Sequence, residues 1–252
     1  MTDFFVCSKS TKRYIKSENY HLVTAPPTKD ILKKAKKFSN VIAIGGGAVI
    51  DTAKILSKTP ITCYPTTASG ASDTSHSVYW DGSNKKNFNS FLPKQVFLKK
   101  EYVDTLPSQL VLETKSDLIA HCLDVIWSKD KSKDSDFFAK KGLDIISKDS
   151  SNLALIKAGR FGGKAIEITP TTILHALSYP LTGVYNISHG LALSFLIPRV
   201  SSLMNFNPPD INYTNSLPKI DWSIVIKKAM EYPKFHNTNK KINFENLMSV
   251  LS

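Results

Sequence analysis

Four side chains in the second half of the chain have the types and spacing of metal ligands. Asp117 and His121, in "SDLIAHCLD", are four residues apart, which places both on one face of a helix. His175 and His189 follow on either side of "YPLTGVYNIS". One carboxylate and three imidazoles suit a divalent iron or zinc ion and leave room for a substrate oxygen. Taken singly, each histidine could equally be a core or surface residue, but together the four residues predict a metal site.

The segment between His175 and His189 is expected to bring these two side chains to one cavity. Pro180 and Gly183 are predicted to end or bend the helix that carries His175, so that the chain turns back. Tyr179 follows His175 by one helical turn on the same face, where a phenol could donate or relay a proton. A simple packing role for Tyr179 is the alternative.

A glycine-rich loop in the first half has the form of an anion-binding site. "VIAIGGGAVIDTAK", residues 41 to 54, is an apolar strand, three glycines and the start of a helix, so backbone N–H groups can approach an anion. It is neither the GxGxxG fingerprint nor a Walker loop, and a tight turn without a ligand is the alternative. "PTTASGASD", residues 65 to 73, follows the next predicted strand and should lie at the same edge of the sheet.

The elements that carry these groups change in kind near "YVDTLPSQ", residues 102 to 109. Before it, short apolar runs alternate with helical patterns, which indicates βαβ units and a parallel sheet. The predicted strands are "FFVCS", "YHLVTA", "VIAIGGG" and "ITCYPTT", and the predicted helices are "DILKKAKKFS" and "AVIDTAKILSK". After it, long segments are apolar at helical spacing. We therefore expect an α/β domain over residues 1–105 and an all-helical domain over residues 106–252.

The composition of the 252-residue chain is that of a soluble globular protein, with 42% hydrophobic residues and a mean hydropathy of −0.15, and we expect a cytoplasmic location from the two features that follow. There is no run of roughly 18 apolar residues and therefore no expected membrane partner. Met1-Thr2-Asp3 does not begin a signal peptide. Cys7, Cys63 and Cys122 are odd in number and form no CxxC pair, so we expect reduced thiols.

The net charge of +12 does not indicate a nucleic-acid partner. Only three of the 33 basic residues are arginine, the residue that bidentate phosphate and base recognition favours. The lysines are spread along the chain, as on a solvated surface. A positive field of this kind would also attract a small anionic substrate.

Four motifs, in order and spacing, resemble the iron-containing (group III) alcohol dehydrogenases, which share their fold with glycerol dehydrogenase and dehydroquinate synthase. They are "GGGAVIDTAK", "PTTASGASD", "SDLIAHCLD" and "HALSYPLTGVYNISHG", and the resemblance covers about residues 23 to 205. It implies an abridged dehydroquinate synthase-like fold, with an α/β dinucleotide-binding domain and an all-α metal-binding domain. It also implies Fe²⁺, or Zn²⁺, held by Asp117, His121, His175 and His189. The cofactor would be NAD(H) or NADP(H), with the pyrophosphate on Gly45, Gly46, Gly47 and Asp51 and with Thr66 and Thr67 lining the cofactor.

The chain departs from the family pattern at several points. Ala48 stands where serine is usual, the run Ser69 to Asp73 replaces Gly-Thr-Gly-Ser-Glu, and Tyr179 stands where many members have histidine. The chain is short for the family at both ends. "TAPPT", after the second predicted strand, offers no carboxylate to select NAD, so NADP stays open.

Two segments resemble a narrower branch, the phosphonoacetaldehyde reductases or hydroxyethylphosphonate dehydrogenases. They are "GKAIEITPTTILHALSYPLT", residues 163 to 182, and "VYWDGSNKK", residues 78 to 86. The resemblance implies that phosphonoacetaldehyde is reduced to 2-hydroxyethylphosphonate by hydride transfer, with the metal as Lewis acid and Tyr179 as the branch's usual residue. For the anionic tail the first candidates are Lys164 and Arg160, with a solvated helix-end charge as the alternative for each. We expect a homodimer.

Other functions remain open at this point. One alternative is a dehydroquinate synthase-like or glycerol dehydrogenase-like enzyme on the same fold. Another is a shortened, catalytically silent protein that binds a nucleotide.

Overall fold

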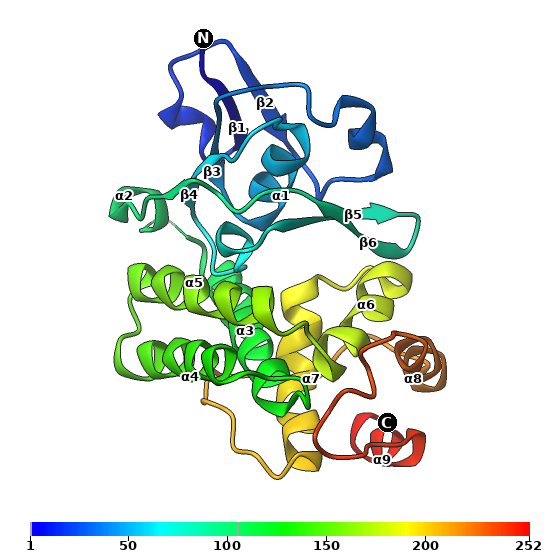
Figure 1. The fold of residues 1–252 in the computed structure, drawn as a ribbon. Coiled ribbons are helices and arrows are strands. Elements are labelled where there is room, and N and C mark those ends of the chain that lie inside the picture. The colour runs from blue at the N-terminus through cyan, green and yellow to red at the C-terminus, as the bar shows by residue number, and fades with distance from the viewer. Residues whose placement is uncertain (1, 105) are drawn as a thin grey trace.

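The first part of the chain forms a parallel sheet (Figure 1) in the computed structural model, which describes residues 2–104 and 106–252. The five strands lie in the order β2-β1-β3-β4-β7, and every pair is parallel. They are β1 (Phe4–Ser8), β2 (Tyr20–Val23), β3 (Val41–Gly45), β4 (Thr62–Pro65) and β7 (Gln95–Val96). The predicted α/β class is confirmed for this part.

One helix covers the middle of the sheet and closes its core. Helix α1 (Gly47–Leu56) packs Ile50 and Ala53, both fully buried, against Val6 and Ala43 of adjacent strands. In a parallel sheet the carboxyl ends of the strands meet at one edge. The glycine loop before α1 and the loop after β4 therefore lie at the same edge, as the sequence predicts.

All elements that the structure describes beyond Leu106 are helices. They are α3 (Ser108–Trp127), α4 (Lys133–Lys148), α5 (Asn152–Ile168), α6 (Ile173–Tyr185), α7 (His189–Leu203), α8 (Trp222–Met230) and α9 (Phe244–Leu251), preceded by the short α2 (Lys100–Val103). Helix α3 lies in the middle and contacts α4, α5, α6 and α7 (Figure 1). Its residues Leu118, Ile119 and Leu123 are completely buried, so it is a core helix. The all-helical second part is confirmed, while the predicted boundary falls at residue 105, outside the described residues, and stays a prediction.

The predicted helix at "DILKKAKKFS" is wrong. The segment forms only a short 3-10 helix, η2 (Lys29–Lys34), and the chain then turns at Lys36, whose φ is 50°. None of the residues of η2 is buried, so no apolar face packs against the sheet to stabilise a longer helix. The clustered lysines would also repel one another at helical spacing.

A two-stranded hairpin that the sequence did not predict contacts helix α1 of the first part and helix α6 of the second. Strands β5 (His76–Asp81) and β6 (Asn84–Asn89) pair in antiparallel fashion around a turn in which Gly82 has a φ of 61°. The hairpin extends over helix α6 (Figure 1). There, a Cβ atom at Gly183 would collide with the carbonyl oxygen of Ser83, so glycine permits the close approach.

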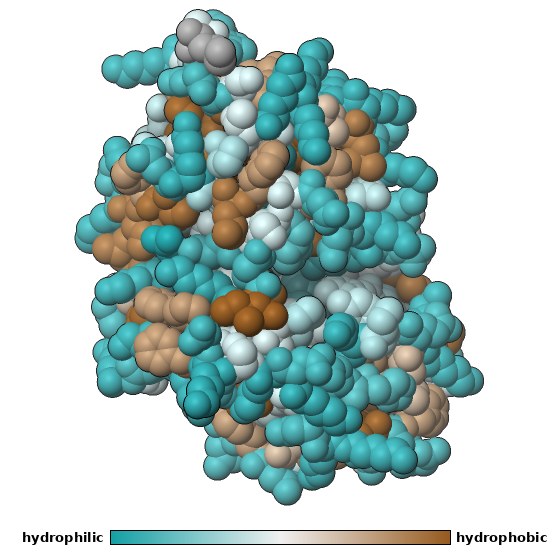
Figure 2. Space-filling model, viewed as in Figure 1, coloured by the Kyte–Doolittle hydropathy of each residue, from teal (hydrophilic) through white to brown (hydrophobic). Residues whose placement is uncertain are grey.

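The surface of the protein is largely hydrophilic, as the composition of the chain predicts. Hydrophilic side chains cover most of the face that Figure 2 shows. Among the described residues, no helix is both long and apolar enough to cross a membrane. The three cysteines are buried and unpaired, as expected.

Candidate metal and cofactor site

The four predicted metal ligands converge on one carboxylate oxygen. Helix α3 supplies Asp117 and His121, α6 supplies His175, and α7 begins at His189. The Nε2 atoms of the three histidines lie 3.5, 3.5 and 3.6 Å from Oδ1 of Asp117. Donor atoms of Asp117, His121 and His175 all lie within 4.8 Å of one another. His189 is not part of this group of three, but its Nε2 atom is close to the carboxylate of Asp117.

The atoms at the centre of this cluster lack ordinary partners. Among the described residues, Oδ1 of Asp117 and Nε2 of His175 are buried and accept or donate no hydrogen bond. Leaving such groups unsatisfied costs about 1–3 kcal/mol each. One oxygen and three nitrogen donors suit a divalent metal ion, which would satisfy these atoms. The residues present therefore fit the predicted metal.

The protonation states favour metal binding as well. Burial lowers the pKa of His121 to about 4. Burial, reinforced by the charge of Lys85, holds the pKa of His189 well below its ordinary value. Burial would raise the pKa of Asp117, but the surrounding histidines lower it below its ordinary value. At neutral pH these two imidazoles are neutral and the carboxylate is ionised, which are the forms that bind a metal.

A buried carboxylate that the sequence reading missed holds one of the ligands in place. Oδ2 of Asp124 lies 2.8 Å from Nδ1 of His175, so Nε2 of the same ring turns toward Asp117. Burial opposes protonation of His175, but Asp117 and Asp124 together raise its pKa. Asp124 is the last residue of "SDLIAHCLD", three residues after His121 and on the same side of α3. That spacing was the available signal.

The chain reverses later than predicted between His175 and His189. Helix α6 does not end at Pro180 or Gly183; it continues to Tyr185 and ends at Asn186, whose φ is 55°. Pro180 removes only one donor from the helix, and Asn tolerates the left-handed conformation that ends it. Ser178 then spans the two ligands, because its hydroxyl donates to the carbonyl of His175 and lies 3.3 Å from Nδ1 of His189.

Tyr179 lies beside the cluster. Its ring stacks on His189 with 6.2 Å between centroids and contacts Tyr232 edge-on at 5.4 Å. Burial raises the pKa of Tyr179 to about 12, so the phenol carries its proton at neutral pH. The ammonium of Lys85, in the hairpin, lies 4.9 Å from the centre of the same ring. Neither Tyr232 nor Lys85 was singled out from the sequence, because no local pattern ties them to α6.

A cavity of about 570 Å³ lies at the carboxyl ends of β1 to β4. Gly46, Gly47, Thr66 and Thr67 line it, as the resemblance implies. The remaining lining residues are Ser8, Ser10, Thr11, Arg13, Tyr14, Val23, Thr24, Ala25, Pro26, Ala48, Val49, Tyr102, Leu106, Pro107 and Leu110. Among the described residues, the lining contains no carboxylate, so no acidic residue there selects NAD or NADP.

The geometry of the glycine loop suits a phosphate. A Cβ atom at Gly47 would lie 2.8 Å from Oγ of Ser69, and that hydroxyl is buried without a hydrogen-bond partner among the described residues. The start of α1 thus offers backbone N–H groups, and the loop after β4 places the unused hydroxyl of Ser69 beside them. Gly45 and Asp51 are not among the lining residues. Asp51 is buried, and burial raises its pKa to about 6.

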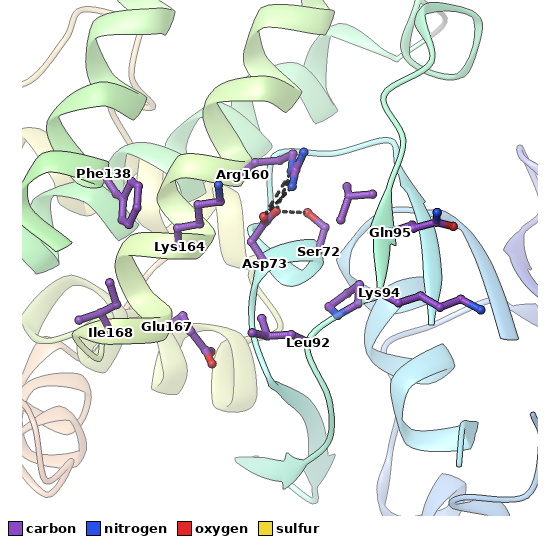
Figure 3. Close-up of a pocket in the computed structure, with 12 residues that line it drawn as sticks. Ser72, Asp73, Leu92, Lys94, Gln95, Phe138, Arg160, Lys164, Glu167 and Ile168 are labelled. Carbon is purple, nitrogen blue, oxygen red and sulfur yellow. Dashed lines mark hydrogen bonds and ion pairs between the residues drawn. The ribbon is translucent and has the colours of Figure 1, made fainter. Parts of the chain in front are cut away.

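The two residues predicted to hold an anionic tail line a different cavity, of about 360 Å³ (Figure 3). Arg160 forms a two-pronged ion pair with Asp73, with two N–O distances of 3.0 Å. Lys164 extends from the next turn of α5, 5.6 Å from the ring of Phe138. None of the four candidate metal ligands lines this cavity. Lys164 and Arg160 are thus near each other but are not part of the metal cluster.

The helical part of the chain matches a known protein family. Residues 112–215 match the sequence family described as the Fe-containing alcohol dehydrogenase family, C-terminal. A 4-hydroxybutyrate dehydrogenase from Clostridium kluyveri is 23% identical over 194 residues, which covers 62% of this chain and 52% of that protein. A phosphonoacetaldehyde reductase from Streptomyces viridochromogenes is 25% identical over 203 residues, covering 63% and 51%. The chain therefore spans about half the length of these curated relatives.

The fold is also that of a solved iron-containing alcohol dehydrogenase. The structure from Thermotoga maritima superimposes with a TM-score of 0.80 at 20% identity, over 99% of this chain and 90% of that one. The similarity extends across both the sheet and the helices.

Proposed function

We propose that this chain, whose residues 112–215 belong to the Fe-containing alcohol dehydrogenase family, is a metal-dependent oxidoreductase that interconverts a small aldehyde and its alcohol with NAD(P)H. The observation that carries the proposal is the convergence of three imidazoles on Oδ1 of Asp117, a buried oxygen without a hydrogen-bond partner among the described residues. A cavity of about 570 Å³, lined by Gly46, Gly47, Thr66 and Thr67, lies at the strand ends of the same chain and supports a cofactor site there.

Different residues have different roles in the proposed hydride transfer. When bound at the cluster, a divalent metal supplies Lewis acidity toward the aldehyde oxygen. Asp124 holds the ring of His175, and the glycine loop with the start of α1 binds the cofactor pyrophosphate. Bound there, NAD(P)H would supply the hydride that reduces the carbonyl carbon. Tyr179, protonated at neutral pH, donates a proton to the oxygen that becomes the alcohol hydroxyl.

Within this class we propose phosphonoacetaldehyde as the substrate, reduced to 2-hydroxyethylphosphonate. The relative of that name, the segments around "SYPLT" and "DGSNKK", and the net charge of +12 support this choice. Relatives of about the same identity act, by their names, on 4-hydroxybutyrate or propanol. Substrate preference is therefore decided by assay.

The test uses iron-loaded protein under anaerobic conditions, with NADH and NADPH, against phosphonoacetaldehyde and propanal. We expect oxidation of at least one coenzyme with both aldehydes and a higher kcat/KM for phosphonoacetaldehyde. Equal kcat/KM values would contradict the substrate but not the reductase. If metal-loaded protein oxidises neither coenzyme with any aldehyde, the proposed reductase activity is wrong, and a silent nucleotide-binding protein becomes the better description.

A further inference from the structure

Lys85 is a cation placed beside the candidate active site without a counter-ion. It lies in β6 and is half-buried, whereas Lys86, the next residue, points to the other face of the hairpin and is exposed. Its ammonium lies 4.9 Å from the ring centre of Tyr179. Among the residues that the structure describes, none forms a hydrogen bond or an ion pair with Lys85.

Contacts at both ends of the hairpin hold it in place and so determine the position of Lys85. At its tip, the carbonyl of Ser83 packs against Gly183 of α6. At its base, the buried Lys54 of α1 donates hydrogen bonds to the carbonyls of Thr74 and His76, at 2.6 and 3.1 Å. The position of the Lys85 ammonium above α6 therefore follows from packing at both ends of the hairpin.

The charge of Lys85 acts on the metal cluster and the cofactor loop alike. Burial lowers the pKa of Lys85, while attraction by Asp117 and Asp51 opposes that shift. A partly desolvated ammonium with no direct partner carries an electrostatic cost, which a bound oxyanion would relieve through charge-assisted hydrogen bonds.

Helix α6, which carries Tyr179, also has a buried hydroxyl group without a hydrogen-bond partner among the described residues. Thr182 follows Tyr179 by three residues, and its Oγ1 atom is buried without a hydrogen-bond partner among the described residues. Residues three apart on a helix are neighbours on its surface, so Thr182 lies beside Tyr179 on α6. Buried hydroxyls normally have partners, which makes Thr182 a second indication of an absent ligand group.

We propose that Lys85, with the hydroxyl of Thr182, binds the anionic tail of the aldehyde. The substrate class is then a short aldehyde with an oxyanion group a few bonds from its carbonyl, long enough to reach from the metal cluster to the hairpin. This inference rests on the proposed reductase function and names the residues that select its substrate. It gives the role to Lys85 rather than to Arg160, which is already paired with Asp73.

The kinetic test compares the two aldehydes in matched variants. Lys85→Met keeps most of the length of the side chain and removes the charge, Lys85→Arg keeps the charge, and Lys86→Met removes a charge from the outer face. For Lys85→Met we expect kcat/KM with phosphonoacetaldehyde to fall about 10- to 100-fold, as for loss of a charged hydrogen bond, with propanal changed less than about threefold. The preference is the ratio of kcat/KM for phosphonoacetaldehyde to kcat/KM for propanal. Lys85→Arg should retain most of this preference and Lys86→Met all of it, whereas Thr182→Val should reduce it. An equal loss for both aldehydes, or a raised KM for NAD(P)H alone, overturns the proposal, because Lys85 would then serve the cofactor.

A binding test keeps this inference separate from the reductase activity. Metal-loaded protein is titrated with ethylphosphonate, which cannot react, and the heat of binding is measured. Binding by the wild type, Lys85→Arg and Lys86→Met, with a loss of at least about tenfold in Lys85→Met, supports the anion site even if no turnover is found. Absence of binding by the wild type, or equal binding by Lys85→Met, overturns it even if the protein reduces aldehydes.

Discussion

Nδ1 of His175 lies 2.8 Å from Oδ2 of Asp124, a carboxylate that is completely buried. The other oxygen of Asp124 accepts hydrogen bonds from the hydroxyl of Thr172 and the backbone N–H of Leu174, in the first turn of α6. A single side chain of α3 thus caps α6 and orients a metal ligand on it. The ligand geometry is therefore set by the packing of two helices before any metal binds.

Asp124→Asn should weaken metal binding by about 10- to 100-fold. The asparagine amide has only one oxygen. Its nitrogen must therefore face either Nδ1 of His175 or the donors in the first turn of α6, and the donors on that side lose their acceptor. The dissociation constant for Fe²⁺ or Zn²⁺, measured by competition with a chromophoric chelator, checks this. Asp134→Asn, on the exposed start of α4, is the control and should leave the constant unchanged. Unchanged affinity in Asp124→Asn would show that the ring of His175 is held by other contacts.

His189→Ala should lower the reductase activity by orders of magnitude and release the metal, while nucleotide binding persists. His189 contributes to the cluster from the start of α7, and it does not line the dinucleotide cavity. Metal content by elemental analysis and NAD(P)H binding by fluorescence separate the two effects. Full activity in this variant would remove His189 from the ligand set.

Gly47→Ala should raise the KM for NAD(P)H at least about tenfold without changing the metal content. The added Cβ atom would lie 2.8 Å from Oγ of Ser69 and would fill the approach to the start of α1. Steady-state kinetics with the coenzyme as the varied substrate measures the effect. An unchanged KM would place the pyrophosphate elsewhere.

Metal binding should raise the melting temperature of the protein. At a free metal concentration of about 100 times the dissociation constant, the gain is about 2.7 kcal/mol, which corresponds to roughly 5–10 °C for a chain of this size. Thermal unfolding with and without a chelator measures the shift, and His121→Ala should show none. The same chelator effect in His121→Ala would point to a different metal site.

Lys54→Met should destabilise the protein by about 1–3 kcal/mol at pH 7, because the carbonyls of Thr74 and His76 lose their donor. Burial lowers the pKa of Lys54 below the ordinary 10.5, so between the lowered pKa and 10.5 the unfolded chain binds more protons than the folded one. Stability from this group therefore rises with pH across that window. Urea unfolding at pH 7 and pH 10 measures the free energy of unfolding of the wild type and of Lys54→Met. The difference between the two proteins should be larger at pH 10. A smaller difference at pH 10 would contradict a lowered pKa for Lys54.

Local spacing in the sequence was sufficient for much of the site. The interval between Asp117 and His121 places both on one face of α3 whatever surrounds that helix. The glycines after β3 likewise predict a strand, a tight turn and a helix start from backbone sterics alone. The parallel sheet and the helical second part followed from hydrophobic periodicity. The homodimer and the roles of Tyr179, Lys164 and Arg160 stay predictions.

Other relationships were decided only by the tertiary structure, because they join side chains far apart in the chain. Asp124 and His175 are 51 residues apart, and no periodicity links them. Lys85 was one lysine among many until the hairpin placed it over Tyr179. Arg160 resembled a free cation until Asp73 was found beside it. Spacing along one helix is dictated by its own geometry, whereas contacts between elements depend on how their buried faces pack, and a single sequence does not contain that packing in any local pattern.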